Sequence, residues 1–163
     1  MKYVNFCFAA IVLFALMSSS VKSDRIAIGY FPGDELPNFS FSDSDGRNFD
    51  LRGYRGKKVV INFWAINDAQ SRATNVQLHN FLVRNFPDVE MISICFDENE
   101  QVFERTVLLD QLGNHSQFCD VEGAQSEIFR NFRLYRGFRS FLLDENGAIM
   151  SINLTPERLK EIL

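Results

Sequence analysis

An uninterrupted apolar run at residues 59–65 constrains the fold of this chain more than any other feature. It reads Val-Val-Ile-Asn-Phe-Trp-Ala, and its only polar member is Asn62. A strand with one face in water alternates apolar and polar residues, whereas a strand buried on both faces is continuously apolar. The run therefore predicts the central strand of a sheet that is covered on both faces, as in α/β proteins.

The segments around this run alternate between helix and strand patterns. Residues 68–86 contain no Gly or Pro and are predicted to form one long helix, followed by a buried strand at 89–96 and a helix at 98–112. The later elements are predicted to be a short strand at 117–119, a third helix with Ala124, Ile128, Phe132 and Tyr135 on one face, an antiparallel strand pair at 138–143 and 148–154, and a last helix that begins at Thr155. This order predicts a mostly parallel sheet with an antiparallel edge.

Residues 1–23 have the composition of a secretory signal peptide. Lys2 gives the positive start, residues 6–17 are almost wholly apolar, and small residues follow up to Ser23. An apolar stretch of about a dozen residues is short for a transmembrane helix. We therefore expect cleavage after Ser23, one mature domain at 24–163 and no membrane span after cleavage. The alternative is that the segment is retained as an N-terminal anchor.

The charged and metal-binding residues exclude several functions. The 17 Lys and Arg residues against 21 Asp and Glu residues give a net charge of −4. A nucleic-acid-binding surface needs a basic field, so no nucleic-acid partner is expected. The two His residues have no partners at metal-ligand spacing, and the chain has no glycine-rich phosphate loop. We therefore expect neither a metal nor a cofactor.

Four segments of the chain follow one known pattern. They are the Gly-Asp-Glu-Leu-Pro-Asn-Phe entry at 33–39, the hairpin turn at 43–47, the central strand with its approach at 51–65, and the final hairpin at 141–147. Together they resemble the thioredoxin-like superfamily, in its TlpA/ResA (AhpC/TSA) branch, over residues 33–163. The resemblance implies a thioredoxin-like fold, with a central mixed β-sheet flanked by helices on both faces and an N-terminal β-hairpin extension. It also implies export to the periplasm or cell envelope of a bacterium.

The chain departs from this branch at the redox site. Family members carry a Cys-x-x-Cys pair at the start of the helix after the central strand, and here Asp68 and Ser71 stand at those two positions. The cis-proline that precedes the last strands is also missing, because residues 136–141 contain no proline. The loss of both parts predicts that disulfide exchange is no longer the function, and no residue is assigned as catalytic.

The replaced site is predicted to be a groove. Asp68 is a preferred helix N-cap, which favours a role in the scaffold, and the alternative is a carboxylate that binds a ligand. Ser71 lacks a neighbouring base and is interpreted as filling the space of a thiol. The groove is predicted to be lined by Trp64, Asn67, Asp68, Ser71, Phe138 and Arg139. Arg136 or Arg139 either forms an ion pair with Asp68 or belongs to a solvated basic edge.

Cys95 and Cys119 are the two cysteines that remain in the mature chain. They fall on strands that the predicted fold makes neighbours, and such strands lie roughly 5 Å apart, so a disulfide is geometrically allowed. The alternative is a pair of buried thiols that behave as small apolar residues. Neither cysteine is expected at a helix N-terminus, where a low pKa would make it a nucleophile.

Two functions follow from this sequence. The first is an exported thioredoxin-like protein with a replaced redox site, which acts as a non-catalytic binding module for a protein or peptide partner in the envelope. The second is a thiol-disulfide oxidoreductase or antioxidant protein of the same branch that uses Cys95 and Cys119.

Overall fold

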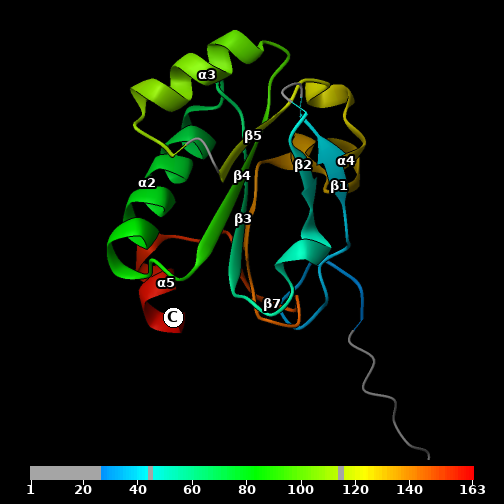
Figure 1. Ribbon diagram of the computed structural model, residues 1–163. Helices are drawn as coiled ribbons and strands as arrows, with labels where there is room; N and C mark the ends of the chain where they lie inside the picture. The colour runs from blue at the N-terminus through cyan, green and yellow to red at the C-terminus, as the bar shows by residue number, and fades with distance from the viewer. Residues whose placement is uncertain (1–26, 44–45, 114–115) are drawn as a thin grey trace, which may run out of the picture.

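The computed structural model describes residues 27–43, 46–113 and 116–163, and these form three layers (Figure 1). The middle layer is a five-stranded sheet with the order β5-β4-β3-β6-β7, in which β3, β4 and β5 are parallel and β6 and β7 are antiparallel. Its strands are β3 (Val59–Trp64), β4 (Glu90–Phe96), β5 (Gln117–Asp120), β6 (Ser140–Leu143) and β7 (Ile149–Ile152). The predicted mixed sheet with an antiparallel edge is confirmed.

The two outer layers differ in kind. One face of the sheet carries the helices α2 (Ala69–Asn85), α3 (Glu100–Leu109) and α5 (Pro156–Ile162). The other face carries the antiparallel hairpin of β1 (Ser40–Ser42) and β2 (Asn48–Asp50), the 3-10 turn η1 (Leu51–Tyr54) and the short helix α4 (Glu127–Asn131). The sheet is therefore covered on both sides, and the predicted N-terminal hairpin is present.

All six residues of β3 are buried, which explains its continuously apolar sequence. Because side chains alternate along a strand, Ile61 and Phe63 point toward the hairpin and α4, whereas Val60 and Trp64 point toward the helices. The hairpin side is packed with phenyl rings in edge-to-face contact. Phe63 and Phe132 show this geometry, with their ring centroids 4.8 Å apart.

A row of buried polar side chains crosses the helix-covered face. Asn62, Ser93 and Gln117 lie opposite one another on β3, β4 and β5. Asn75 of α2 reaches this row: its Oδ1 accepts hydrogen bonds from Asn62 Nδ2 at 3.1 Å and Ser93 Oγ at 2.7 Å. Its Nδ2 donates to Gln117 Oε1 at 3.1 Å. Each of these four side chains is at most 1% exposed, so the network supplies partners for buried amide and hydroxyl groups, and only Gln117 Nε2 among them is left without one.

The polar row divides the apolar packing under the helices into two clusters. Leu78 and Leu82 of α2 belong to the cluster nearer the start of the parallel strands, and Trp64 and Phe103 belong to the cluster nearer their carboxyl ends. An apolar interface alone would allow α2 to slide along the sheet, because dispersion contacts have little directionality. The hydrogen bonds of Asn75 fix one register of α2.

The predicted third helix is wrong as a single element. The chain forms the 3-10 turn η3 (Gly123–Gln125), then α4, then the 3-10 turn η4 (Leu134–Arg136). Ser126 caps α4, and Arg133 adopts a left-handed conformation with φ 54° that interrupts the helical path. Ala124 and Tyr135 are consequently exposed, although Ile128 and Phe132 are buried as the spacing predicted.

The predicted signal peptide at 1–23 lies outside the described residues, as do parts of the β1–β2 turn and of the loop before β5. Within the described part of the chain, no helix is both long and apolar enough to cross a membrane.

We predict that Asn75→Ala lowers the free energy of unfolding by about 3 kcal/mol, because it leaves several buried polar groups without a partner. The measurement is a urea denaturation curve followed by far-UV circular dichroism. Gln77→Ala, at an exposed position of the same helix, is the matched control and should change stability by less than about 0.5 kcal/mol. Equal stability of the two variants would contradict the role given to Asn75.

Candidate binding groove at the start of α2

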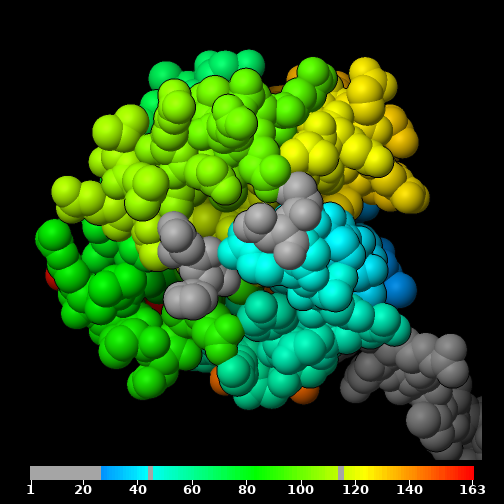
Figure 2. All heavy atoms as spheres, turned by 45° about the horizontal axis from the view of Figure 1, so that its top comes forward, coloured from blue at the N-terminus to red at the C-terminus, as the bar shows by residue number. Residues whose placement is uncertain are grey.

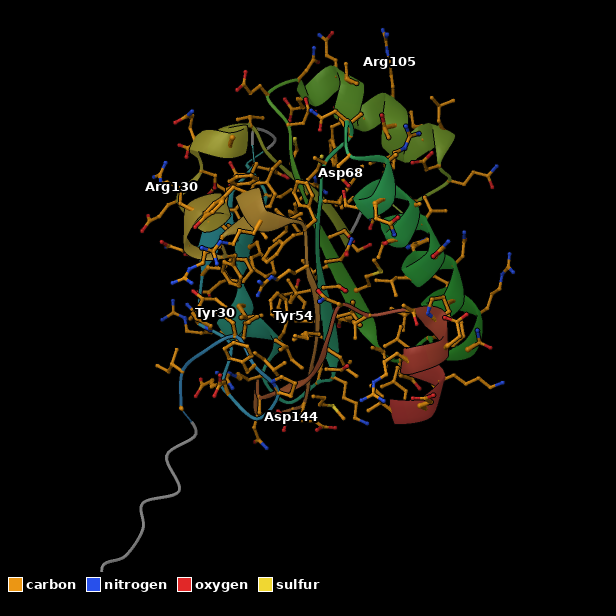
Figure 3. All side chains as sticks on the ribbon, turned by 180° about the vertical axis from the view of Figure 1, so that it is seen from behind. Tyr30, Tyr54, Asp68, Arg105, Arg130 and Asp144 are labelled. Atoms are coloured by element: carbon orange, nitrogen blue, oxygen red, sulfur yellow. The ribbon has the colours of Figure 1, made fainter. Side chains whose placement is uncertain are left out.

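Asp68 caps the N-terminus of α2, as the sequence predicts. The chain leaves β3 at Trp64, turns, and places Asp68 in an extended conformation with φ −100°. The Asp68 carboxylate accepts a hydrogen bond from the backbone N–H of Ser71 at 2.7 Å, and the Asp68 carbonyl accepts one from Arg72 N at 3.0 Å. Asp68 lies at the end of the molecule opposite the β6–β7 turn, which contains Asp144 (Figure 3).

The hydroxyl of Ser71 has a structural role. Ser71 is 6% exposed, and its Oγ accepts a hydrogen bond from Ala65 N and donates one to the Asp68 carbonyl, both at 3.2 Å. These bonds tie the first turn of α2 to the end of β3. His79 lies two turns further along α2, and burial lowers its pKa. Within the described part of the chain, no base contacts Ser71, so the arrangement does not support a serine nucleophile.

A bidentate ion pair holds the same end of α2 against α3. Arg72 Nε and one terminal guanidinium nitrogen each lie 2.7 Å from a carboxylate oxygen of Asp110, the residue that ends α3. The hydrogen bond to Asp110 is the main cause of a raised pKa of Arg72. The planar, two-point geometry fixes orientation as well as distance. The start of α2 is therefore attached to β3 on one side and to α3 on the other.

Two hollows flank Asp68. The first, of about 350 Å³, lies between the first turns of α2 and the loop that leads into β6. It is lined by residues that include Asp68, Gln70, Ser71, Thr74, Phe138, Arg139 and Asn153. The second, of about 550 Å³, lies between Asp68 and the segments that follow β4 and β5. Asn67, Asp68, Asp97, Glu98, Phe96, Phe129 and Phe138 are among its lining residues.

Five of the six predicted groove residues line one or both hollows. Asn67 lines only the second, Ser71 and Arg139 line only the first, and Asp68 and Phe138 line both. The assignment of Trp64 to the groove is wrong. Its side chain is fully buried and packs on Phe103 of α3, because the alternation of β3 turns it toward the helices.

The arginines near the groove do not form the ion pair that the sequence allows. Arg139 shares the first hollow with Asp68, but no salt bridge joins Asp68 to any arginine of the described residues. The Arg136 guanidinium instead lies 5.7 Å from the ring centroid of Tyr135, which is 64% exposed. Arg136 is exposed, as a solvated basic edge requires, whereas Arg139 is half-buried beside the first hollow. Every peptide bond of the described residues is trans, including those of the loop before β6.

The second hollow combines carboxylates with phenyl rings. Asp97 and Glu98 directly follow β4, so the parallel strands bring them to the same sheet edge as Asp68. Ligands of parallel sheets commonly bind at this carboxyl edge. The rings of Phe96, Phe129 and Phe138 contact one another in the same hollow, with the Phe96 and Phe129 centroids 5.5 Å apart and the Phe129 and Phe138 centroids 6.1 Å apart.

The sequence prediction missed Asp97, Glu98 and Phe129 as groove residues. Asp97 follows its buried strand directly, and that position was a usable signal. Phe129 reaches the hollow because α4 is short and the chain changes direction sharply after it. The predicted single long helix had no such change of direction.

The two cysteines of the described residues lie opposite each other. Cys95 and Cys119 are register partners on β4 and β5, and both are free thiols with at most 1% exposure. Cys119 Sγ lies 3.5 Å from the Asp97 carbonyl, to which it donates. Burial is the main cause that raises the pKa of the Cys95 thiol far above its usual range, and the neighbouring Cys119 adds to the shift. A thiolate, which is the reactive form, is therefore strongly disfavoured at Cys95.

The described residues contain no group of three His, Cys, Asp or Glu side chains arranged to hold a metal ion.

Comparisons with known proteins point to one family. The Redoxin family model matches residues 31–162. A crystal structure of a thioredoxin-like protein from Parabacteroides distasonis is 38% identical, with a TM-score of 0.74 over 85% of this chain and 98% of that chain. The thiol-disulfide oxidoreductase ResA of Bacillus cereus is 26% identical, over 100% of this chain and 97% of its own length. The C-terminal domain of a thiol-disulfide oxidoreductase from Bacteroides thetaiotaomicron, described as putative, is 26% identical with a TM-score of 0.68, over 80% of this chain and 92% of that chain.

We predict that Asp68→Ala lowers the free energy of unfolding by about 0.5–2 kcal/mol, because the N–H of Ser71 loses its acceptor. Asp68→Asn should retain most of the stability, since Asn is an equally good N-cap. Both are measured by urea denaturation, with the exposed Gln70→Ala as the control in the same turn. Unchanged stability of Asp68→Ala would show that the carboxylate is not acting as a cap and would favour a binding role for it.

Proposed function

The chain belongs to the Redoxin family, and we propose that within this family it is a binding domain that does not catalyse disulfide exchange. On this proposal, the groove beside Asp68 holds a segment of a protein or peptide partner. The proposal includes export, because residues 1–23 have the composition of a signal peptide, and it places the domain in a bacterial cell envelope because relatives such as ResA come from bacteria.

The residues at the N-terminus of α2 are the main support for this proposal. Exchange requires a thiolate at an accessible site, and a helix N-terminus provides one by lowering the pKa of a cysteine. Here that position is held by Asp68, a residue without a thiol, whose carboxylate is bonded to the first turn. Ser71, one turn further on, is buried, and its hydroxyl is hydrogen-bonded to the backbone of both Ala65 and Asp68.

The chemistry of the two hollows supports binding of an extended chain segment. The first hollow presents side chains able to donate and accept hydrogen bonds, among them Gln70, Thr74 and Asn153, beside the phenyl ring of Phe138. The second presents three carboxylates and three phenyl rings. A cationic side chain gains from both the carboxylates and the ring faces. Lysine or arginine of a partner therefore suits the second hollow.

One observation favours a second function. Cys95 and Cys119 face each other in register, so oxidation would need little movement of the strands. A thiol-disulfide oxidoreductase could use such a pair. Against this, both thiols are buried and the pKa of Cys95 is raised, whereas exchange needs an exposed thiolate.

We predict that the chain does not catalyse reduction of insulin by dithiothreitol above the uncatalysed rate. The assay follows the turbidity of precipitating insulin B chain, with a Cys-x-x-Cys member of the family as the positive control. Turnover comparable to that control would overturn the proposal. Asp68→Cys combined with Ser71→Cys restores the pair, and we expect its turnover to stay well below the control, because the proline of the family is still missing.

Thiol accessibility distinguishes the two functions. We expect Cys95 and Cys119 to react with Ellman's reagent only after the chain is unfolded in guanidinium, because both are buried. Fast reaction of either thiol in the folded chain, or loss of two free thiols after isolation without reductant, would favour the oxidoreductase.

Binding at the groove is measured separately by amide chemical shifts of the ¹⁵N-labelled chain. The probe is insulin B chain with its cysteines blocked by iodoacetamide, which is an unfolded chain that has no free thiol. Shifts confined to residues 67–74, 96–98 and 137–140 are expected. Phe138→Ala should reduce them, because Phe138 lines both hollows, whereas Gln77→Ala should not. Shifts of equal size in both variants, or no shifts near these residues, would contradict binding in the groove.

A further inference from the structure

The outer edge of β1 carries backbone groups that no strand uses. In the β1–β2 hairpin, the Phe39 carbonyl accepts from Leu51 N, and Asp43 N donates to the Arg47 carbonyl. Residues of an antiparallel edge strand alternate between bonding their partner and pointing away from it. Ser40 and Ser42 therefore direct their N–H and C=O groups away from β2. Within the described part of the chain nothing pairs with these groups, and both residues are exposed.

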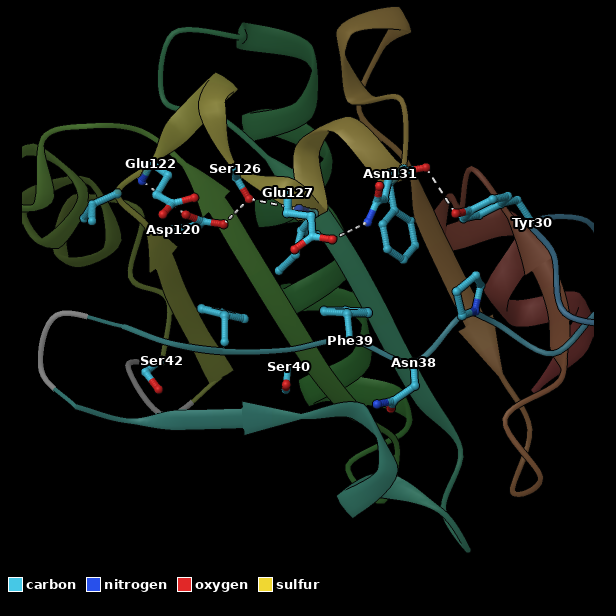
Figure 4. A pocket seen from close by; sticks show the side chains of 15 residues that line it. Tyr30, Asn38, Phe39, Ser40, Ser42, Asp120, Glu122, Ser126, Glu127 and Asn131 are labelled. Carbon is cyan, nitrogen blue, oxygen red and sulfur yellow. Dashed lines mark hydrogen bonds between the residues drawn. The ribbon is translucent and has the colours of Figure 1, made fainter.

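A groove of about 670 Å³ lies along this edge. Its two walls are residues 38–42 on one side and the segments 120–122 and 126–132 on the other. Figure 4 shows Asn38, Ser40 and Ser42 along the first wall and Asp120, Glu122 and Glu127 along the second. Part of its floor is apolar, because the buried Phe39, Ile128 and Phe132 also line it. In the space-filling view, the hairpin in cyan and the segment around α4 in yellow lie next to each other (Figure 2).

The charged side chains that line the groove are all negative. Its charged lining residues are Asp120, Glu122 and Glu127, and no lysine or arginine is among the residues that line it. Asp120 accepts hydrogen bonds from Glu122 N and from the hydroxyl of Ser126, which fix its position, whereas Glu122 and Glu127 are exposed at the rim. A wall of carboxylates attracts a cationic ligand and repels an anionic one.

We propose that β1 is a docking edge for an extended, basic peptide segment, which adds as a further strand along residues 38–42. Main-chain hydrogen bonds to Ser40 and Ser42 supply the register, and lysine or arginine side chains of the peptide meet Glu122 and Glu127. This is strand addition, in which the backbone gives affinity and alternate side chains give specificity. The five residues of the edge span roughly 17 Å, enough for a short strand.

The hairpin is held firmly enough to receive a strand. The Arg47 guanidinium bonds the carboxylate of Asp43 at 2.7 Å and the carbonyl of Gln117 on β5 at 3.0 Å, and it lies 4.9 Å from the ring centroid of Phe118. Phe41 packs on the ring of Phe118 as well. These contacts fasten β1 and β2 to the central sheet, so the hairpin itself has little conformational entropy to lose when a peptide binds.

The docking edge is independent of the proposed groove at Asp68. Its lining residues are not shared with either hollow beside Asp68, and the turn of Gly123 and Ala124 lines the second hollow, on the other side of the same segment. The two proposals therefore make separate predictions about where a peptide binds.

The first experiment titrates the ¹⁵N-labelled chain with a capped hexapeptide of alternating lysine and valine. We expect the largest amide shifts at residues 38–42, 120–122 and 126–128, and a dissociation constant that rises at least fivefold between 50 and 200 mM salt, on the order expected when several charges are screened. The same peptide with glutamate in place of lysine should not bind. Shifts centred on residues 67–74, or equal binding of the acidic peptide, would overturn the docking edge.

The second experiment tests strand pairing directly. Two peptides of the same sequence are methylated on alternate backbone nitrogens, one on the odd and one on the even positions. Because only every second N–H of an added strand faces its neighbour, one peptide should bind like the parent and the other at least tenfold more weakly. Equal affinities for the two methylated peptides would exclude strand addition.

The variants separate charge from folding. Glu122→Gln with Glu127→Gln should weaken binding of the basic peptide at least fivefold at 50 mM salt. Glu157→Gln with Glu161→Gln removes the same charge from α5 and is the matched control. Ser40→Pro removes one outward N–H and should abolish binding, with retained far-UV circular dichroism showing that the fold survives. Identical affinities of the two double variants would refute the role of the acidic wall.

Discussion

The hydrogen bonds of Asn75 determine where α2 sits, and the rest of the functional architecture depends on that position. Apolar contacts provide most of the driving force for packing a helix on a sheet, but they specify its register poorly. Asn75 pairs with side chains from β3, β4 and β5 at once. A shift of α2 by one turn would leave buried amides unpaired, so the start of the helix, with Asp68, is fixed relative to the carboxyl ends of the strands.

The fixed start of α2 explains the structural role of Asp68 and Ser71. A helix N-terminus presents unpaired N–H groups that an anion or a capping side chain must satisfy. Asp68 satisfies one of them, and Ser71 connects the turn back to β3. The resulting end is held by side-chain hydrogen bonds, and hollows remain open on both sides of it. A rigid site beside open hollows is well suited to binding, because little order has to be created on association.

Charge is distributed unevenly around these hollows. The parallel strands β3, β4 and β5 end at one edge, and Asp68, Asp97 and Asp120 lie at or just beyond their ends. The wall opposite β1 continues this acidic surface through Glu122 and Glu127. One topological fact, that parallel strands end together, therefore gathers carboxylates that are far apart in the sequence, and gives both proposed sites a preference for cationic partners.

The sequence by itself determined the layers of the fold and the absence of a Cys-x-x-Cys pair at the start of α2. The continuously apolar run at 59–65 predicts a strand that is buried on both faces. Asp68 follows this strand, and its residue type alone predicts a helix N-cap there. Tertiary structure alone decided that Trp64 is buried away from the groove, that the third helix is broken at Arg133, and that Asp97 lies near Asp68. These outcomes depend on which strands become neighbours and on packing between distant segments, and local periodicity carries no information about either.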